Sequence, residues 1–178
     1  MRLITVLAAS LALASCATAE APAPAAQACA VSAEDRAWID ASLEAWRFTA
    51  REISGVATLR PFQAVFFDDD CVLTAADAFS AERAADVVWT AAPHEGQVPL
   101  PTGDHVPAGV VSFASADGEA AFLVMSTPSV WRAAGVNADA LGLEAMMTAV
   151  LLHEGAHVAQ SATYGARMTA LVAANNLA

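Results

Sequence analysis

The amino-acid sequence predicts an α+β domain, in which helical segments at both ends enclose a central region of short strands. Residues 32–53 carry apolar side chains at helical spacing, and residues 139–160 are apolar on nearly every side of a helix. Between these segments, short apolar runs alternate with turn-forming residues, which is typical of strands and hairpins. Without its leader the chain retains about 160 residues, enough for one domain with its own core.

The first helix is expected to begin at Ser32. The run Ser32-Ala33-Glu34-Asp35 has a hydroxyl that can cap a helix, followed by acids in the first turn. The apolar side chains that follow at helical spacing are interpreted as a core-facing stripe, in preference to a binding surface. They are Ile39, Leu43, Trp46, Ala50 and Ile53.

Strands are expected in the middle of the chain. Residues 61–67 and 71–73 flank Asp68-Asp69-Asp70, which is interpreted as a solvated turn in preference to a calcium site. A hairpin is predicted from residues 110–113 and 121–125, with Asp117-Gly118 at its turn.

Residues 93–107 contain four prolines and two glycines and are expected to form a long loop. His94, Glu95 and His105 lie in this segment. They could serve a metal, but loop histidines are more often ordinary surface residues, and we interpret them so.

The apolar segment from Asp139 to Gln160 predicts a helix buried in the core, with Asp139 as its N-cap. Gly142 and Gly155 each weaken a helix by about 1 kcal/mol relative to alanine. Gly155 would be tolerated where a small residue lets the helix approach a sheet. A second apolar helix is expected to start at Gly165.

The run His153-Glu154-Gly155-Ala156-His157 lies within this predicted helix. Residues four apart on a helix differ by about 40° around the axis and about 6 Å along it, so both imidazoles point from one face toward one place. Two imidazoles at this spacing can hold zinc, and Glu154 beside them can take a proton from a metal-activated water. The alternative is a pair of histidines that happens to line a core helix.

With Val150-Leu151-Leu152 before it and Val158-Ala159 after it, this motif resembles the active-site helix of the zincin metallopeptidases. The resemblance implies a small mixed sheet packed on the buried metal helix, with an N-terminal helix. It also implies Zn²⁺ bound by His153 and His157, Glu154 as general base, and a peptide or protein substrate. In that architecture an edge strand ahead of the metal helix pairs with extended peptide. Residues 122–126 are the candidate, with a plain core strand as the alternative.

The sequence does not identify the third zinc ligand. Gln160 and Thr163 stand where a metzincin would need glycine and histidine, so that branch of the family is excluded. Gluzincin-like members take a glutamate from a following helix, but residues 158–178 contain no Asp, Glu or His. The sequence therefore ends before its third ligand, takes a ligand from upstream such as Glu119 or His105, or has no working site. We favour the first alternative.

The N-terminus predicts export. Residues 1–15 resemble a signal peptide, and Leu13-Ala14-Ser15-Cys16 resembles the lipobox of bacterial lipoproteins, in which the cysteine is lipidated. An ordinary signal peptide cut after Ala17-Thr18-Ala19 is the alternative. Lipidation of Cys16 would leave Cys29 and Cys71 to form a disulfide in an oxidising periplasm. Residues 16–31 are then a flexible tether, and residues 32–178 form the catalytic domain.

The charge of the chain bears on its partners. The formal net charge is −11 and the isoelectric point is about 4.5. Such an acidic surface repels nucleic acid, so no nucleic-acid partner is expected. The sequence therefore predicts a zinc peptidase that faces the periplasm on a lipid anchor or is secreted. The alternative is an inactive zincin-like lipoprotein that acts as a binding or scaffold module.

Overall fold

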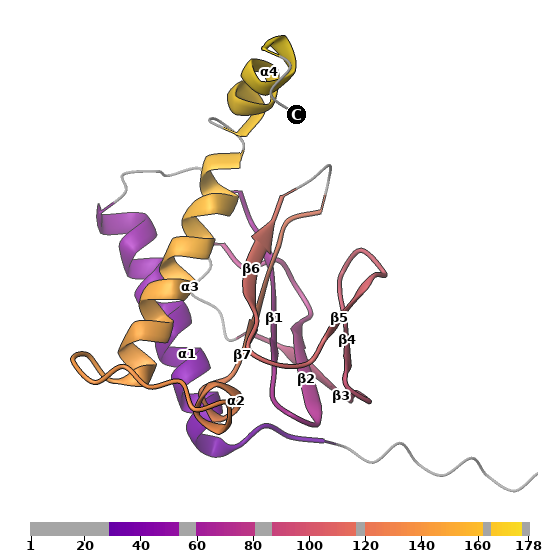
Figure 1. Ribbon diagram of the computed structural model, residues 1–178, viewed down its shortest axis with the longest axis vertical. Helices are drawn as coiled ribbons and strands as arrows, with labels where there is room; N and C mark the ends of the chain where they lie inside the picture. The colour runs from indigo at the N-terminus through magenta and orange to yellow at the C-terminus, as the bar shows by residue number, and fades with distance from the viewer. Residues whose placement is uncertain (1–28, 54–59, 81–86, 117–119, 162–164, 176–178) are drawn as a thin grey trace, which may run out of the picture.

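The computed structural model describes residues 29–53, 60–80, 87–116, 120–161 and 165–175. The predicted signal peptide, Cys16 and most of the predicted tether lie outside these residues. The described residues form a mixed α+β domain, which confirms the predicted class (Figure 1). The helices are α1 (Ala33–Phe48), the π-helical turn η1 (Thr49–Ile53), α2 (Pro128–Ala133), α3 (Leu143–Gln160) and α4 (Ala166–Ala174). The strands are β1 (Gln63–Phe67), β2 (Cys71–Ala75), β3 (Trp89–Pro93), β4 (Gln97–Pro99), β5 (His105–Pro107), β6 (Ser112–Ser115) and β7 (Phe122–Ser126).

Five strands form one mixed sheet in the order β3-β2-β1-β7-β6. β1 and β7 are parallel, with Val65 opposite Val124, and the other neighbours are antiparallel. The candidate peptide-binding strand, residues 122–126, is therefore an inner strand, and all five of its residues are buried. The edge strand on this side is β6. The plain core strand was the correct alternative for residues 122–126.

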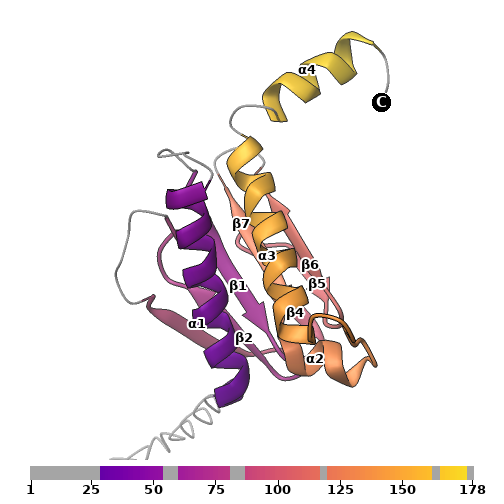
Figure 2. The same cartoon turned by 90° about the vertical axis from the view of Figure 1, so that its left-hand side faces the viewer.

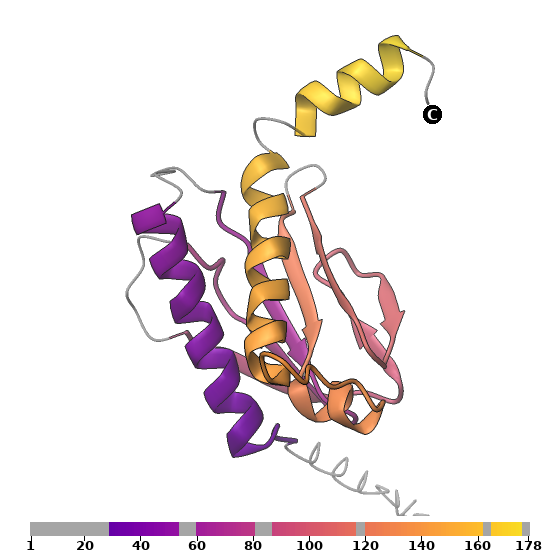
Figure 3. The same ribbon diagram turned by 60° about the vertical axis from the view of Figure 1, so that its left-hand side comes forward.

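The two faces of the sheet bury different partners. Because side chains alternate along a strand, Phe66 and Leu123 face the helices, whereas Val65 and Val124 face the opposite side. Figure 3 shows α1 and α3 side by side over the first face. The β4–β5 hairpin covers part of the other face, where Val98 is fully buried. The prediction of a long loop for residues 93–107 is wrong, because this segment contains the paired strands β4 and β5 and the buried Val98.

Four of the five residues of the stripe predicted on the first helix, Ile39, Leu43, Trp46 and Ala50, are confirmed as core. Ser32 accepts a hydrogen bond from the Asp35 backbone N–H at 3.0 Å and so caps α1. Ile39, Leu43 and Trp46 are buried against the sheet. The Trp46 ring packs edge-on against Phe62, with ring centroids 5.1 Å apart.

Helix α3 differs from its prediction in two ways. It begins at Leu143, after Gly142 with φ of +79°, and Asp139 lies in the preceding turn instead of capping the helix. It buries one stripe only, formed by Leu143, Met147, Leu151, Gly155 and Val158. The prediction that α3 is buried on every side is wrong. Several of its apolar residues are exposed alanines, whose small side chains have little apolar area to bury.

The predicted second apolar helix is present as α4. In the figures it lies beyond the C-terminal end of α3, away from the sheet (Figure 2). Within the described ranges, no helix combines the length and hydropathy that a bilayer span needs.

Cys29 and Cys71 form a disulfide, with their Cα atoms 5.6 Å apart. Cys71 is the first residue of β2, and Cys29 lies four residues before α1. The bond therefore fastens the entry of α1 to the sheet.

A buried carboxylate joins α1 to α2. Asp35 is 2% exposed and accepts hydrogen bonds from the backbone N–H of Ser129 at 3.1 Å and from its Oγ at 2.6 Å. Ser129 lies in the first turn of α2, where backbone N–H groups have no partner within the helix. The side chain of one helix thus satisfies the N-terminus of another.

We expect Asp35→Ala to lower the free energy of unfolding by about 2 kcal/mol, because two donors of Ser129 lose a charged acceptor. Urea denaturation measures the change. Asp40→Ala is the matched control: its exposed pair with Arg36 should contribute at most about 0.5 kcal/mol. Equal losses in the two variants would contradict the role of Asp35.

Candidate metal centre

The motif His153-Glu154-Gly155-Ala156-His157 lies in the last turns of α3. Its two imidazoles meet: Nε2 of His153 and Nε2 of His157 are 3.0 Å apart, and the ring centroids are 4.5 Å apart. Both side chains are exposed. Two nitrogens bound to one tetrahedral zinc at about 2.05 Å would be about 3.3 Å apart, so a small rotation of either ring suits the pair to zinc.

Glu154 follows His153 directly and is partly buried. On a helix it projects about 100° round from His153 and about 60° from His157. Its carboxylate therefore leaves α3 beside the imidazoles rather than between them. This is the side from which a carboxylate can take a proton from a water held at the two nitrogens.

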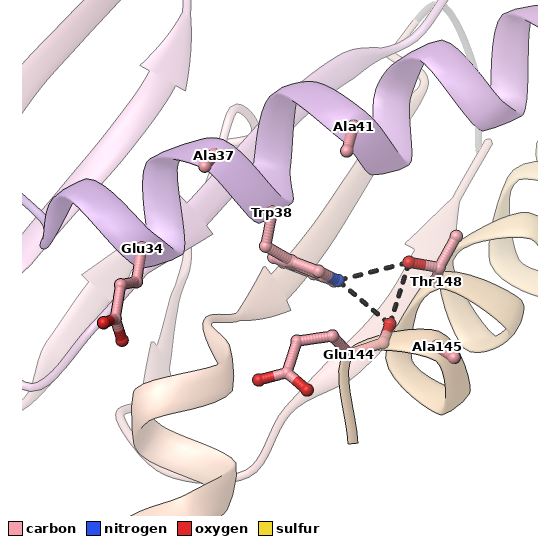
Figure 4. Close-up of a pocket in the computed structure, with 7 residues that line it drawn as sticks. All are labelled: Glu34, Ala37, Trp38, Ala41, Glu144, Ala145 and Thr148. Carbon is pink, nitrogen blue, oxygen red and sulfur yellow. Dashed lines mark hydrogen bonds between the residues drawn. The ribbon is translucent and has the colours of Figure 1, made fainter. Parts of the chain in front are cut away.

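Polar contacts fix the N-terminal half of α3 on α1. The indole Nε1 of Trp38 donates to the Glu144 carbonyl at 3.1 Å and to Thr148 Oγ1 at 3.2 Å (Figure 4). Ser42 Oγ and Thr148 Oγ1 are 2.8 Å apart and also hydrogen bond. These contacts set the rotation of α3 about its own axis.

The C-terminal half of α3 is fixed by a close approach at Gly155. A methyl group added to Gly155 would overlap Nε1 and Cδ1 of the Trp46 indole. The glycine thus admits an indole from α1, and not the sheet surface that the sequence suggested. The sequence identified Trp46 only as a core residue. The sequence signal that could have indicated this contact is the presence of a glycine, Gly155, in the interior of a helix.

The imidazoles lie on the opposite flank of α3 from α1. His153 and His157 are each two residues from Gly155, which corresponds to about 160° around the helix. Besides α1 and α2, α3 packs against the edge strand β6 and against its inner neighbour β7 (Figure 2). The motif is therefore exposed on the side where the sheet ends.

The described residues do not supply a third ligand. Within these ranges, no three His, Cys, Asp or Glu side chains come together as a metal site. His105 lies in β5, and the β4–β5 hairpin covers the opposite face of the sheet from α3. It cannot join the imidazoles, so this upstream alternative is wrong. Glu119, the other upstream alternative, lies outside the described residues.

Two of the remaining candidates, Asp68 and His94, have structural partners. Asp68 accepts hydrogen bonds through Oδ1 from the backbone N–H groups of Asp70 and Cys71, so the acidic triplet forms the predicted turn. His94 Nε2 lies 2.9 Å from the Asp68 carbonyl oxygen, and its ring packs edge-on against Phe67. This histidine stabilises the turn.

We expect Gly155→Ala to lower the free energy of unfolding by about 1–3 kcal/mol through overpacking against Trp46. At an exposed helix position the same change stabilises by about 1 kcal/mol, so the expected sign is reversed here. In a Trp46→Phe background the cost should shrink, because the smaller ring leaves space for the methyl group. Chemical denaturation of the four proteins measures this coupling. A stabilising Gly155→Ala would contradict the contact.

No protein-family model, curated protein or solved structure matches this chain. The resemblance to zincins therefore stays a prediction based on one motif. In the described residues, this motif places two imidazole nitrogens 3.0 Å apart on the exposed flank of a helix, with a carboxylate beside them.

Proposed function

We propose that this chain is a zinc-dependent peptidase in which His153 and His157 bind the metal and Glu154 is the general base. The observation that carries the proposal is the 3.0 Å separation of the two Nε2 atoms on one exposed flank of α3. Imidazole nitrogen is a preferred zinc ligand, and the separation is close to that required by tetrahedral coordination.

A zinc ion at this place would polarise the scissile carbonyl and acidify a water molecule. Glu154 accepts the proton of the attacking water through a carboxylate oxygen and then donates it to the leaving amine. Partial burial of Glu154 limits competition from bulk water for that proton. The buried stripe of α3 holds both imidazoles on a rigid element, which keeps the donor atoms in place.

Catalytic zinc sites take three protein ligands, and we place the third outside the described residues. We assign β6 as the strand that an extended peptide substrate would pair with. Of the two edge strands of the sheet, β6 is the one that packs against α3, so a peptide added to it would run beside the imidazoles.

We further propose that the domain works at the cell envelope, facing the periplasm on a lipid anchor at Cys16. The Cys29–Cys71 disulfide supports an oxidising compartment, since such bonds are rare in the cytosol. Residues 16–31 would act as the tether between the lipid and α1.

The second candidate is a zincin-like binding or scaffold module without turnover. It is favoured by one observation, the lack of a third ligand among the described side chains. Zinc content separates the two functions. One tightly bound equivalent after dialysis supports the peptidase, and a metal-free protein supports the module.

We expect Glu154→Gln to keep its zinc and lose peptidase activity by about 10²–10⁴-fold, because the general base is removed and the ligands are not. His153→Ala should lose zinc and activity together. His105→Ala is the matched control, since its ring lies beyond the opposite face of the sheet. Elemental analysis and cleavage of unstructured peptide libraries measure both properties. Full activity in Glu154→Gln would eliminate the general-base role.

A further inference from the structure

A groove lies between α1 and α3, away from the imidazoles (Figure 4). Its volume is about 550 Å³, and its lining is mostly apolar. Small side chains leave this space open on both helices, and the indole of Trp38 crosses its base. The lining residues are Glu34, Ala37, Trp38, Ala41, Glu144, Ala145 and Thr148.

One end of the groove is acidic. Glu34 and Glu144 lie in the first turns of α1 and α3, and Figure 4 shows their carboxylates on the same side of the Trp38 ring. Glu144 is paired with Arg132, but Glu34 has no ion pair with any cation in the described ranges. The groove thus suits an apolar segment that brings a positive charge at one end.

Helix α4 has this complementary chemistry. Met168 and Leu171 are 57% and 49% exposed, and they lie three residues apart on one face. Arg167 stands directly before them in the first turn, and α4 contains no acid. Among the described residues, Arg167 has no ion-pair partner.

The α4 of the same chain cannot bring its positive charge to the acidic end of the groove. If α4 folded back along its own α3, it would run antiparallel to α3, so Arg167 would lie toward Thr148 and Leu171 toward Glu144. The pairing of Arg167 with Glu34 and Glu144 therefore needs α4 of another copy.

We infer that α4 of one copy occupies the α1–α3 groove of a second copy, and that the exchange is reciprocal. With two α3 helices antiparallel, the end of each α3 lies at the acidic end of the other copy's groove. There Arg167 meets Glu34 and Glu144, while Met168 and Leu171 cover the alanines. A two-fold exchange of this kind closes as a dimer.

Sedimentation velocity of the full chain over about 1–100 μM tests the inference, since the population of a dimer depends on concentration. The expected result is a dimer that Leu171→Asp weakens by at least about tenfold in Kd. Val110→Asp is the matched control, because Val110 is 44% exposed but precedes β6. A monomer throughout, or equal effects of the two substitutions, overturns the inference.

A charge exchange tests the partners directly. Glu34→Arg and Arg167→Glu should each weaken association, and a chain with both changes should recover it. All these positions are exposed, so folding should survive, and circular dichroism checks this. Failure of the double variant to recover overturns the assigned pairing. Zinc content and peptidase activity do not enter either measurement, so the outcome is independent of the proposed function.

Discussion

The contact between the Trp46 indole and the backbone of Gly155 is the constraint on which the arrangement of the site depends. It brings α3 against α1 at the level of the motif, and the bonds from Trp38 and Ser42 to Thr148 hold the other half of the helix. Contacts in both halves fix the rotation of α3. That rotation decides that His153 and His157 leave the helix on the side away from α1. A glycine that lowers helix propensity is thus compensated by the packing it permits.

The features that the sequence predicted correctly depend on local geometry. The Ser32 cap, the buried face of α1 and the meeting of two imidazoles four residues apart follow from the period of the helix, whatever the rest of the chain does. The same local reasoning gave a wrong N-cap for α3. Gly142, with positive φ, precedes the first residue of the helix, and Asp139 lies in the turn before it.

The order of the strands was not predictable in this way. Residues 112–115 and 122–126 form one hairpin, and either could lie at the edge. The parallel pairing of β7 with β1 decides it, and that pairing joins segments about 60 residues apart. The exclusion of His105 has the same origin. As a histidine, His105 was a possible ligand from the sequence. Only the position of the β4–β5 hairpin shows that the sheet lies between His105 and α3.

The two flanks of α3 can serve separate roles because a helix presents them in different directions. His153 is five residues from Thr148, which corresponds to about 140° around the axis and about 8 Å along it. A helix seated on Thr148 and Ala145 therefore leaves the imidazoles uncovered. Association through the groove and metal binding at His153 and His157 are compatible in one molecule. Each copy of a dimer would keep its β6 edge and its motif exposed on the far side from the exchanged helix.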